Sequence, residues 1–127
     1  MHELSIIHSI LETAEQELRR RGEGYTVESI ELEIGELAGV EISTVEFLWP
    51  AAVGQTVLEN AGCSITRMPG TAHCHDCGAS FTLQQYFDPC PDCGSHLLHI
   101  TGGEELRIKS LTLVSREAPA DIYQNWN

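Results

Sequence analysis

Four cysteines in the middle of the chain have the residue types and the spacing of a metal site. Cys74 and Cys77 are separated by two residues, as are Cys90 and Cys93, and twelve residues lie between the two pairs. Each pair is followed by a glycine, so each can form a tight knuckle whose backbone amides point at the thiolates. Two such knuckles brought together give the tetrahedral S₄ site that zinc prefers, with iron as the chemical competitor. Because four thiolates leave no open coordination position, this pattern predicts a structural rather than a catalytic metal.

The first three residues offer a second set of ligands. A large residue at position 2 usually prevents removal of the initiator methionine, so we expect the mature chain to start Met1-His2-Glu3. The α-amine, an amide nitrogen and the His2 imidazole can then form two fused chelate rings around one ion, with the Glu3 carboxylate nearby. Nitrogen-rich tetragonal sites suit Ni(II) or Cu(II). On these residues alone, however, the favoured interpretation is a histidine that happens to lie in a frayed terminus.

Further histidines surround the cysteine pairs, at positions 73, 75, 96 and 99. Each taken alone is typical of an exposed residue or of an outer shell around the metal. As a group they offer spare nitrogen ligands or a pH-sensitive shell near a metal. The fifth cysteine, Cys63, has no cysteine neighbour in the sequence, and we expect it to be a small buried core residue.

The charge of the chain limits its partners. The net charge is −12, from 19 acidic and seven basic residues, and the segment from Met68 to Leu106 contains no Lys or Arg. This composition disfavours binding to nucleic acid or to an anionic membrane, both of which require a basic surface. No signal peptide and no membrane-length apolar stretch is present, so we expect a cytoplasmic protein in which CxxC pairs bind metal rather than form disulfides. Without a nucleophile, a triad or an open metal site, we predict no enzymatic activity.

The elements that must position these residues follow from the hydrophobic pattern. Apolar residues at three- and four-residue steps predict a helix over residues 4–22. Alternating apolar and acidic residues then predict a half-buried strand over residues 27–37. Ser43 and Glu46 form a capping-box pattern that opens a second helix, which Pro50 is expected to kink or end.

Two further strands, at residues 63–68 and 106–113, flank the cysteine-rich segment. The chain is therefore predicted to have an α+β fold, in which a small three-stranded sheet with two helices carries an inserted four-cysteine zinc-ribbon module. Residues 1–68 with 104–115 would form the α/β domain, and residues 69–103 the zinc-binding domain. Residues 116–127 lack periodicity, and we expect them to be a frayed tail.

Taken together, these motifs resemble the HypA/HybF family of hydrogenase nickel-incorporation (maturation) proteins over most of the chain. The matching segments are "MHELSI" at the start, "IGELAGVE" after the first strand, the two CxxC pairs, and "GEELRIKSLTL" in the closing strand. Each motif alone is common, but their occurrence together in this order and spacing is specific to the family.

The resemblance implies a nickel metallochaperone that delivers Ni(II) to maturing [NiFe]-hydrogenase, and in some relatives to urease. It implies two partners, a nickel-linked maturation GTPase and the hydrogenase large-subunit precursor. The α/β domain would bind Ni(II) as cargo through the Met1 amine, His2 and, less directly, Glu3, which reverses the interpretation of the terminus given above. Whether another side chain completes the nickel shell is left open, with Glu41, His96 and His99 as candidates. The cysteines at 74, 77, 90 and 93 would hold structural Zn(II).

A different function remains possible on the same residues. A zinc-ribbon adaptor that only mediates protein–protein contacts would carry the same cysteines, with His2 incidental. Titration with Ni(II) separates these alternatives, because an adaptor has no nickel site that depends on His2.

Overall fold

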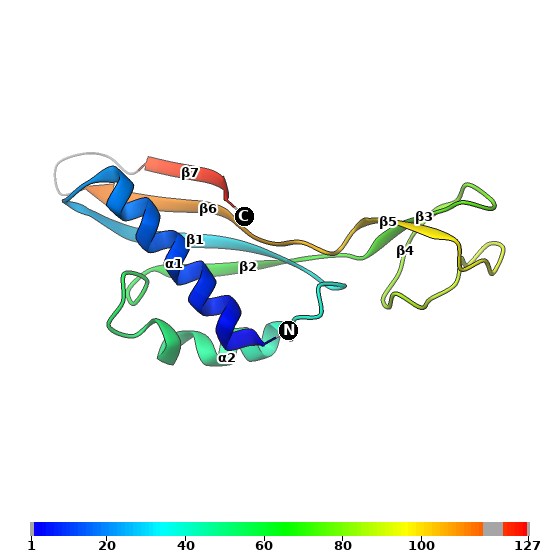
Figure 1. Ribbon diagram of the computed structural model, residues 1–127, viewed down its shortest axis with the longest axis horizontal. Helices are drawn as coiled ribbons and strands as arrows, with labels where there is room; N and C mark the ends of the chain where they lie inside the picture. Colours follow the sequence, from blue (N-terminus) through cyan, green and yellow to red (C-terminus); the bar gives the residue numbers. More distant parts are fainter. Residues whose placement is uncertain (1, 116–120, 127) are drawn as a thin grey trace.

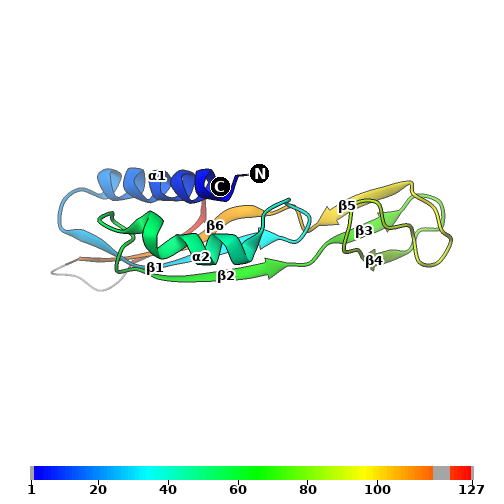
Figure 2. The ribbon, with the colours of Figure 1, turned by 90° about the horizontal axis from the view of Figure 1, so that it is seen from below.

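The computed structural model describes the backbone of residues 2–115 and 121–126. Helices α1 (Glu3–Arg21) and α2 (Ile42–Val53) lie on one face of a four-stranded sheet of order β2-β1-β6-β7 (Figures 1 and 2). The strands of this sheet are β1 (Tyr25–Gly35), β2 (Gly62–Met68), β6 (Leu106–Ser115) and β7 (Asp121–Trp126). A second sheet of order β4-β3-β5 extends from one end of this α/β unit. It contains β3 (Thr71–Cys74), β4 (Ser80–Thr82) and β5 (Leu98–Gly102).

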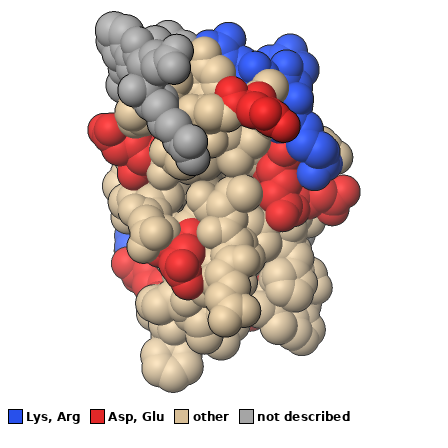
Figure 3. All heavy atoms as spheres, turned by 90° about the vertical axis from the view of Figure 1, so that its left-hand side faces the viewer, with Lys and Arg blue, Asp and Glu red and all other residues tan. Residues whose placement is uncertain are grey.

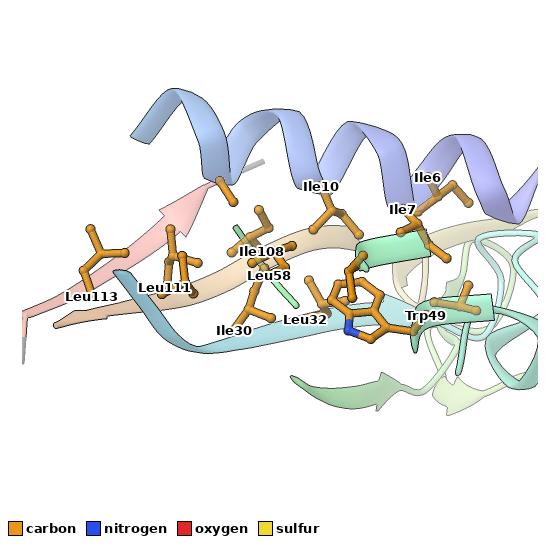
Figure 4. Close-up of a cluster of buried hydrophobic side chains, with 14 residues drawn as sticks. Ile6, Ile7, Ile10, Ile30, Leu32, Trp49, Leu58, Ile108, Leu111 and Leu113 are labelled. Carbon is orange, nitrogen blue, oxygen red and sulfur yellow. The ribbon is translucent and has the colours of Figure 1, made fainter. Parts of the chain in front are cut away.

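The core lies between the helices and the larger sheet. In β1 the alternating residues Ile30, Leu32 and Ile34 are all buried, and Ile7 and Ala14 from α1 are fully enclosed. Figure 4 shows Ile7, Ile30 and Leu32 converging with Trp49 of α2 and Ile108 of β6. Burying each large aliphatic side chain stabilises the fold by roughly 1.5–3 kcal/mol. This core therefore supplies the rigid support from which the start of α1 projects.

The predicted α+β fold with two helices is confirmed, but the larger sheet has four strands rather than three. The fourth is β7, which pairs antiparallel with β6 through Ile108↔Trp126 to Leu113↔Asp121. Residues 121–126 were expected to belong to a frayed tail, and this expectation is wrong for that segment. Their sequence shows no clear alternation, so the strand is specified by its ladder with β6 rather than by a local pattern. Residues 116–120 and 127 lie outside the described part of the chain.

For α2, the predicted capping box is wrong, and Pro50 does not end the helix, whereas a kink at Pro50 stays a prediction. Helix α2 continues through Pro50 to Val53, and its N-cap is Glu41, which makes no side-chain capping hydrogen bond. The hydroxyl of Ser43 donates instead to the Glu41 carboxylate at 3.0 Å. An internal proline costs a helix about 3 kcal/mol. The burial of Trp49 and Val53 against the core offsets that cost.

Cys63 does not occupy the predicted buried position. It lies in β2 and is exposed. The reason is that β2 forms one edge of the sheet, and none of its seven residues is fully buried.

The charged side chains are distributed unevenly along the molecule. Figure 3 shows basic residues gathered at the end of the molecule where α1 finishes, which is the end away from the smaller sheet. Arg19, Arg20 and Arg21 occupy the last turn of α1, where the helix dipole favours positive charge. Neither helix within the described residues has the length and hydrophobicity needed to span a membrane.

The two sheets are joined through closely packed glycine backbones. A Cβ atom on Gly35 would overlap the carbonyl oxygen of Gly103. Gly103 itself has φ of 100°, in the left-handed region that favours glycine. The backbone N–H groups of Gly35 and Leu37 donate to the carbonyls of Glu105 and Gly103, both at 2.7 Å.

Leu37 extends this junction into the smaller sheet. Its side chain is buried in a cluster with Ala72 and Leu83, although it follows β1 in the chain. The buried cluster of the smaller sheet thus includes a residue that follows β1 of the larger sheet, so the two sheets share a packing contact at this junction.

Substituting Gly35 with alanine is therefore expected to destabilise the junction. The methyl group would collide with backbone rather than with a movable side chain, so we expect a loss of about 1–3 kcal/mol or more in the free energy of unfolding. Chemical denaturation measures this loss. Gly54→Ala is the matched control, since Gly54 has φ of −56° and its nearest contact to an added Cβ is 3.6 Å. Equal stabilities for the two variants would contradict the close approach.

Candidate metal centres

The four predicted cysteines meet at one end of the smaller sheet. The Sγ atoms of Cys74 and Cys93 lie 3.6 Å apart, as do those of Cys77 and Cys90, and all four lie within 4.8 Å of one another. A tetrahedral ion with bonds of about 2.3 Å to sulfur sets its ligand atoms about 3.8 Å apart. The donor set and its spacing therefore fit a zinc ion, and equally another tetrahedral thiophilic metal.

The two CxxCG segments fold into knuckles of the same form. In the first, the Gly78 N–H donates to the Cys74 carbonyl at 3.0 Å, and in the second Gly94 does the same to Cys90 at 2.8 Å. Both glycines have positive φ, 78° and 76°, which explains why glycine follows each pair. Within each knuckle the first cysteine is buried and the second is exposed.

Backbone amides prepare one of these sulfurs for ionisation. Hydrogen bonding from the Cys77 backbone N–H, with further help from the amide of Asp76, lowers the pKa of the Cys74 thiol to about 7. Thiolate is the form that binds metal. The first knuckle therefore offers a thiolate near neutral pH before any ion contributes its own charge.

The second predicted centre is at the start of α1. His2 is the N-cap residue of this helix and is exposed, and its side chain makes no capping hydrogen bond. Its carbonyl accepts a hydrogen bond from the Ile6 N–H at 3.3 Å, which ties its backbone to the first turn of α1. Met1, the other predicted nitrogen ligand, lies outside the described residues.

Glu3 is held by a residue far away in the sequence. Its Oε2 accepts a hydrogen bond of 3.1 Å from the backbone N–H of Glu41, the N-cap residue of α2. This contact joins the start of α1 to the start of α2 (Figure 1). A carboxylate has two oxygens and about four lone-pair positions, so the bond leaves capacity for a cation. No sequence pattern pointed to the Glu41 backbone as the partner of Glu3.

The two other histidine candidates lie elsewhere. His96 and His99 belong to the segment that leads into and forms β5, in the smaller sheet, and His99 contacts His75 there. Among the described residues, the cysteine cluster is the only group of three or more potential ligands already within mutual reach. The structure therefore does not bring His2 together with His96 or His99.

The hydrogen bond to Glu3 gives a testable pH dependence. Donation from the Glu41 N–H lowers the pKa of the Glu3 carboxyl below its ordinary value of 4.5. Because the folded pKa is below the unfolded one, the contact contributes its full stabilisation above pH 4.5. That contribution is lost as the pH falls through the lowered pKa. A carbon-detected NMR titration of Glu3 should show this reduced midpoint.

Two variants at position 41 separate the backbone contact from the neighbouring charge. Glu41 has φ of −80°, close to the proline value, so Glu41→Pro removes the N–H with little change of backbone conformation. We expect the pKa of Glu3 to return toward 4.5 in Glu41→Pro and to remain low in Glu41→Ala. A low pKa in both variants would show that this hydrogen bond is not its cause.

Comparison with known proteins places the chain in a family. The family described as hydrogenase/urease nickel incorporation, metallochaperone, HypA matches residues 1–113. The chain belongs to the HypA family. This confirms the family suggested by the terminal, glycine-turn and cysteine motifs together, and the family is one of metallochaperones rather than one defined by a catalytic reaction.

Individual relatives match this HypA-family chain over nearly their whole length. The hydrogenase maturation factor HypA of Parabacteroides distasonis is 45% identical over 113 residues, covering 89% of this chain and 97% of that protein. The HypA of Geobacter metallireducens is 42% identical, with 87% and 97% covered. The solution structure of the Ni metallochaperone HypA from Helicobacter pylori has 25% identity and a TM-score of 0.60, covering 87% of this chain and 96% of that one.

Proposed function

We propose that this protein carries Ni(II) at its N-terminus and delivers it during maturation of [NiFe]-hydrogenase, while a zinc ion at the four cysteines maintains the smaller domain. The observation that carries the proposal is the start of α1, where an exposed His2 stands beside a Glu3 carboxylate held in place from α2. The HypA family match supports nickel as the cargo.

Each terminal residue has a distinct role in this proposal. The Met1 amine and the His2 imidazole supply nitrogen ligands, and the intervening amide closes the chelate rings. Glu3 supplies an oxygen near the ion, and the Glu41 N–H restricts the orientation of that oxygen. The set has few protein ligands and lies at an exposed helix end. Such a site can release its ion by ligand exchange, because a partner can approach the open coordination positions.

The zinc assignment rests on the thiolate chemistry. Four sulfurs close the coordination shell, so the ion would stabilise the fold and leave no position for a substrate. Keeping these thiols reduced suits the cytoplasm, where we place the protein. Its partners would be a nickel-linked maturation GTPase, which loads or receives the ion, and the hydrogenase large-subunit precursor.

A gene-replacement experiment tests this function. In the native host, deletion of the gene should abolish nickel incorporation into the hydrogenase large subunit, and excess nickel in the medium should restore part of it. Wild-type protein should complement the deletion, whereas His2→Ala should fail while accumulating to the same level. Full complementation by His2→Ala would favour the adaptor function, in which the zinc domain alone matters. Measuring urease in the same cells tests the second client.

A further inference from the structure

The exposed face of the smaller sheet carries three histidines that the function proposed above does not use. His73 in β3 lies directly opposite His99 in β5 in the antiparallel register. Residues opposite each other in such a pair place their side chains on the same face, with Cβ atoms about 4.5–5.5 Å apart. His75 is two residues from His73, and both are exposed on either side of the buried Cys74. His75 follows the end of β3 in the turn of the first knuckle, where its backbone N–H donates to the Leu97 carbonyl, next to β5, at 2.9 Å.

Two of the three rings already contact each other. The ring centroids of His75 and His99 are 6.3 Å apart with an interplanar angle of 60°. Two ring nitrogens bound to one ion by bonds of about 2.0–2.1 Å are at most about 4.2 Å apart. Rotation of exposed side chains can make this adjustment, because no surrounding core restrains them. The present separation means that the ion itself would draw the ligands together.

One ring is already oriented by a neighbour. The Nδ1 atom of His73 lies 3.2 Å from the Ser80 hydroxyl on the adjacent strand β4. Histidines that bind metal usually engage their other ring nitrogen in such a hydrogen bond, which fixes the ring and raises its basicity. This contact engages Nδ1 and leaves Nε2 as the ring nitrogen of His73 that can bind an ion.

The charge around the face also favours a cation. The segment between Met68 and Leu106 has no Lys or Arg, and it contains Asp76 beside His75, with Asp88 and Asp92 in the second cysteine segment. Neutral imidazoles in an acidic setting suit borderline divalent ions such as Ni(II), Cu(II) and Zn(II).

We propose that His73, His75 and His99 form a second, exchangeable site for Ni(II) on the exposed face of the zinc domain. Its role, transient binding of Ni(II) during delivery, rests on the nickel-carrier function proposed above. The existence of the site does not depend on His2. Three neutral ligands that are not preassembled bind more weakly than a chelating terminus. The site can therefore accept the ion and pass it on.

The test uses full-length, zinc-loaded protein titrated with Ni(II) by calorimetry and by NMR of the histidine rings. The His2→Ala variant, which lacks the proposed terminal ligand, is the background. In it we expect one remaining nickel site, with selective broadening of the His73, His75 and His99 ring signals. Adding His73→Gln and His99→Gln should weaken this site by about tenfold or more, on the scale of removing a ligand-orienting partner or a ligand itself. Adding His96→Gln, which alters an exposed histidine of the same domain outside the cluster, should leave it unchanged.

The outcomes separate this inference from the terminal site. If His2→Ala binds no nickel at all, or if His96→Gln weakens binding as much as the paired variant, the histidine face is not a site. If wild type and His2→Ala bind nickel identically, the terminal carrier fails while the histidine face can still pass its own test. Zinc stoichiometry must remain that of wild type in every variant. If the paired variant loses zinc, the comparison is repeated with His73→Gln alone.

Discussion

Replacing Cys74 with serine is expected to unfold the smaller sheet while the α/β core persists. The smaller sheet buries only a small apolar cluster, formed by Leu37, Ala72 and Leu83 with partly buried neighbours. Burial stabilises this cluster by roughly 1.5–3 kcal/mol for each large side chain. That is far less than the apparent free energy that structural zinc contributes to the folding of small domains, which is roughly 10–16 kcal/mol. The core between the helices and the larger sheet has no cysteine ligand in it.

Residue-resolved hydrogen exchange, combined with a measurement of zinc stoichiometry, tests this prediction. Amides of β3–β5 should lose protection and the bound zinc should fall well below one per chain, whereas amides of β1 and α1 stay protected. Cys63→Ser is the matched control, because it alters the exposed fifth cysteine outside the cluster. A Cys74→Ser protein that retains one tightly held zinc and a protected β3 would show that the four-thiolate site is not what maintains this domain.

Extending the N-terminus by several residues without His or Cys is expected to weaken nickel binding strongly. The extension converts the Met1 α-amine into a planar amide and moves the new amine away from His2, so the fused chelate rings cannot form. The loss of nickel affinity on removal of a direct ligand should exceed the roughly 10–100-fold loss that follows removal of a group hydrogen-bonded to a ligand. Calorimetric titration with Ni(II) measures the change. A single added residue is avoided, because it can create an amine–Xaa–His motif that binds nickel itself.

Substitutions at the neighbouring residues complete this experiment. His2→Ala should lose at least as much affinity as the extension, and Glu3→Gln less, because the carboxylate is the less direct ligand. Zinc content and thermal stability should not change in the extended protein, since the extension is attached ahead of the exposed His2. If the extended protein binds nickel like wild type while His2→Ala does not, the amine is no ligand. If neither change matters, the terminal nickel site is disproved.

Much of the architecture follows from short-range patterns. Alternation of Ile30, Leu32 and Ile34 predicted β1, and the three- and four-residue apolar steps predicted α1, because burial of one face requires that periodicity. The cysteine knuckles were equally predictable. Their geometry is set within one short segment each, by two thiols and a glycine with positive φ.

Other features depend on partners that lie far away along the chain. Pro50 stays within α2 because the helix is buried against the core, and β7 exists because β6 offers an unpaired edge. Neither segment carries a local signal strong enough to specify its conformation, so the free energy of packing and pairing decides it. Leu37 joins the buried cluster of the smaller sheet for the same reason.

The candidate metal ligands divide along the same line. The residue types and spacing identified the four cysteines, because ligand chemistry and local chelation are properties of short segments, whereas His2 and Glu3 became favoured ligands only through the family resemblance. Only the tertiary structure placed the Glu41 amide on Glu3, 38 residues away, and left His96 and His99 apart from the start of α1. It also set His73 opposite His99 across two strands. Such contacts arise from the register of the sheets and the crossing of the helices, which is fixed by cooperative burial of the whole core and is not encoded in any one segment.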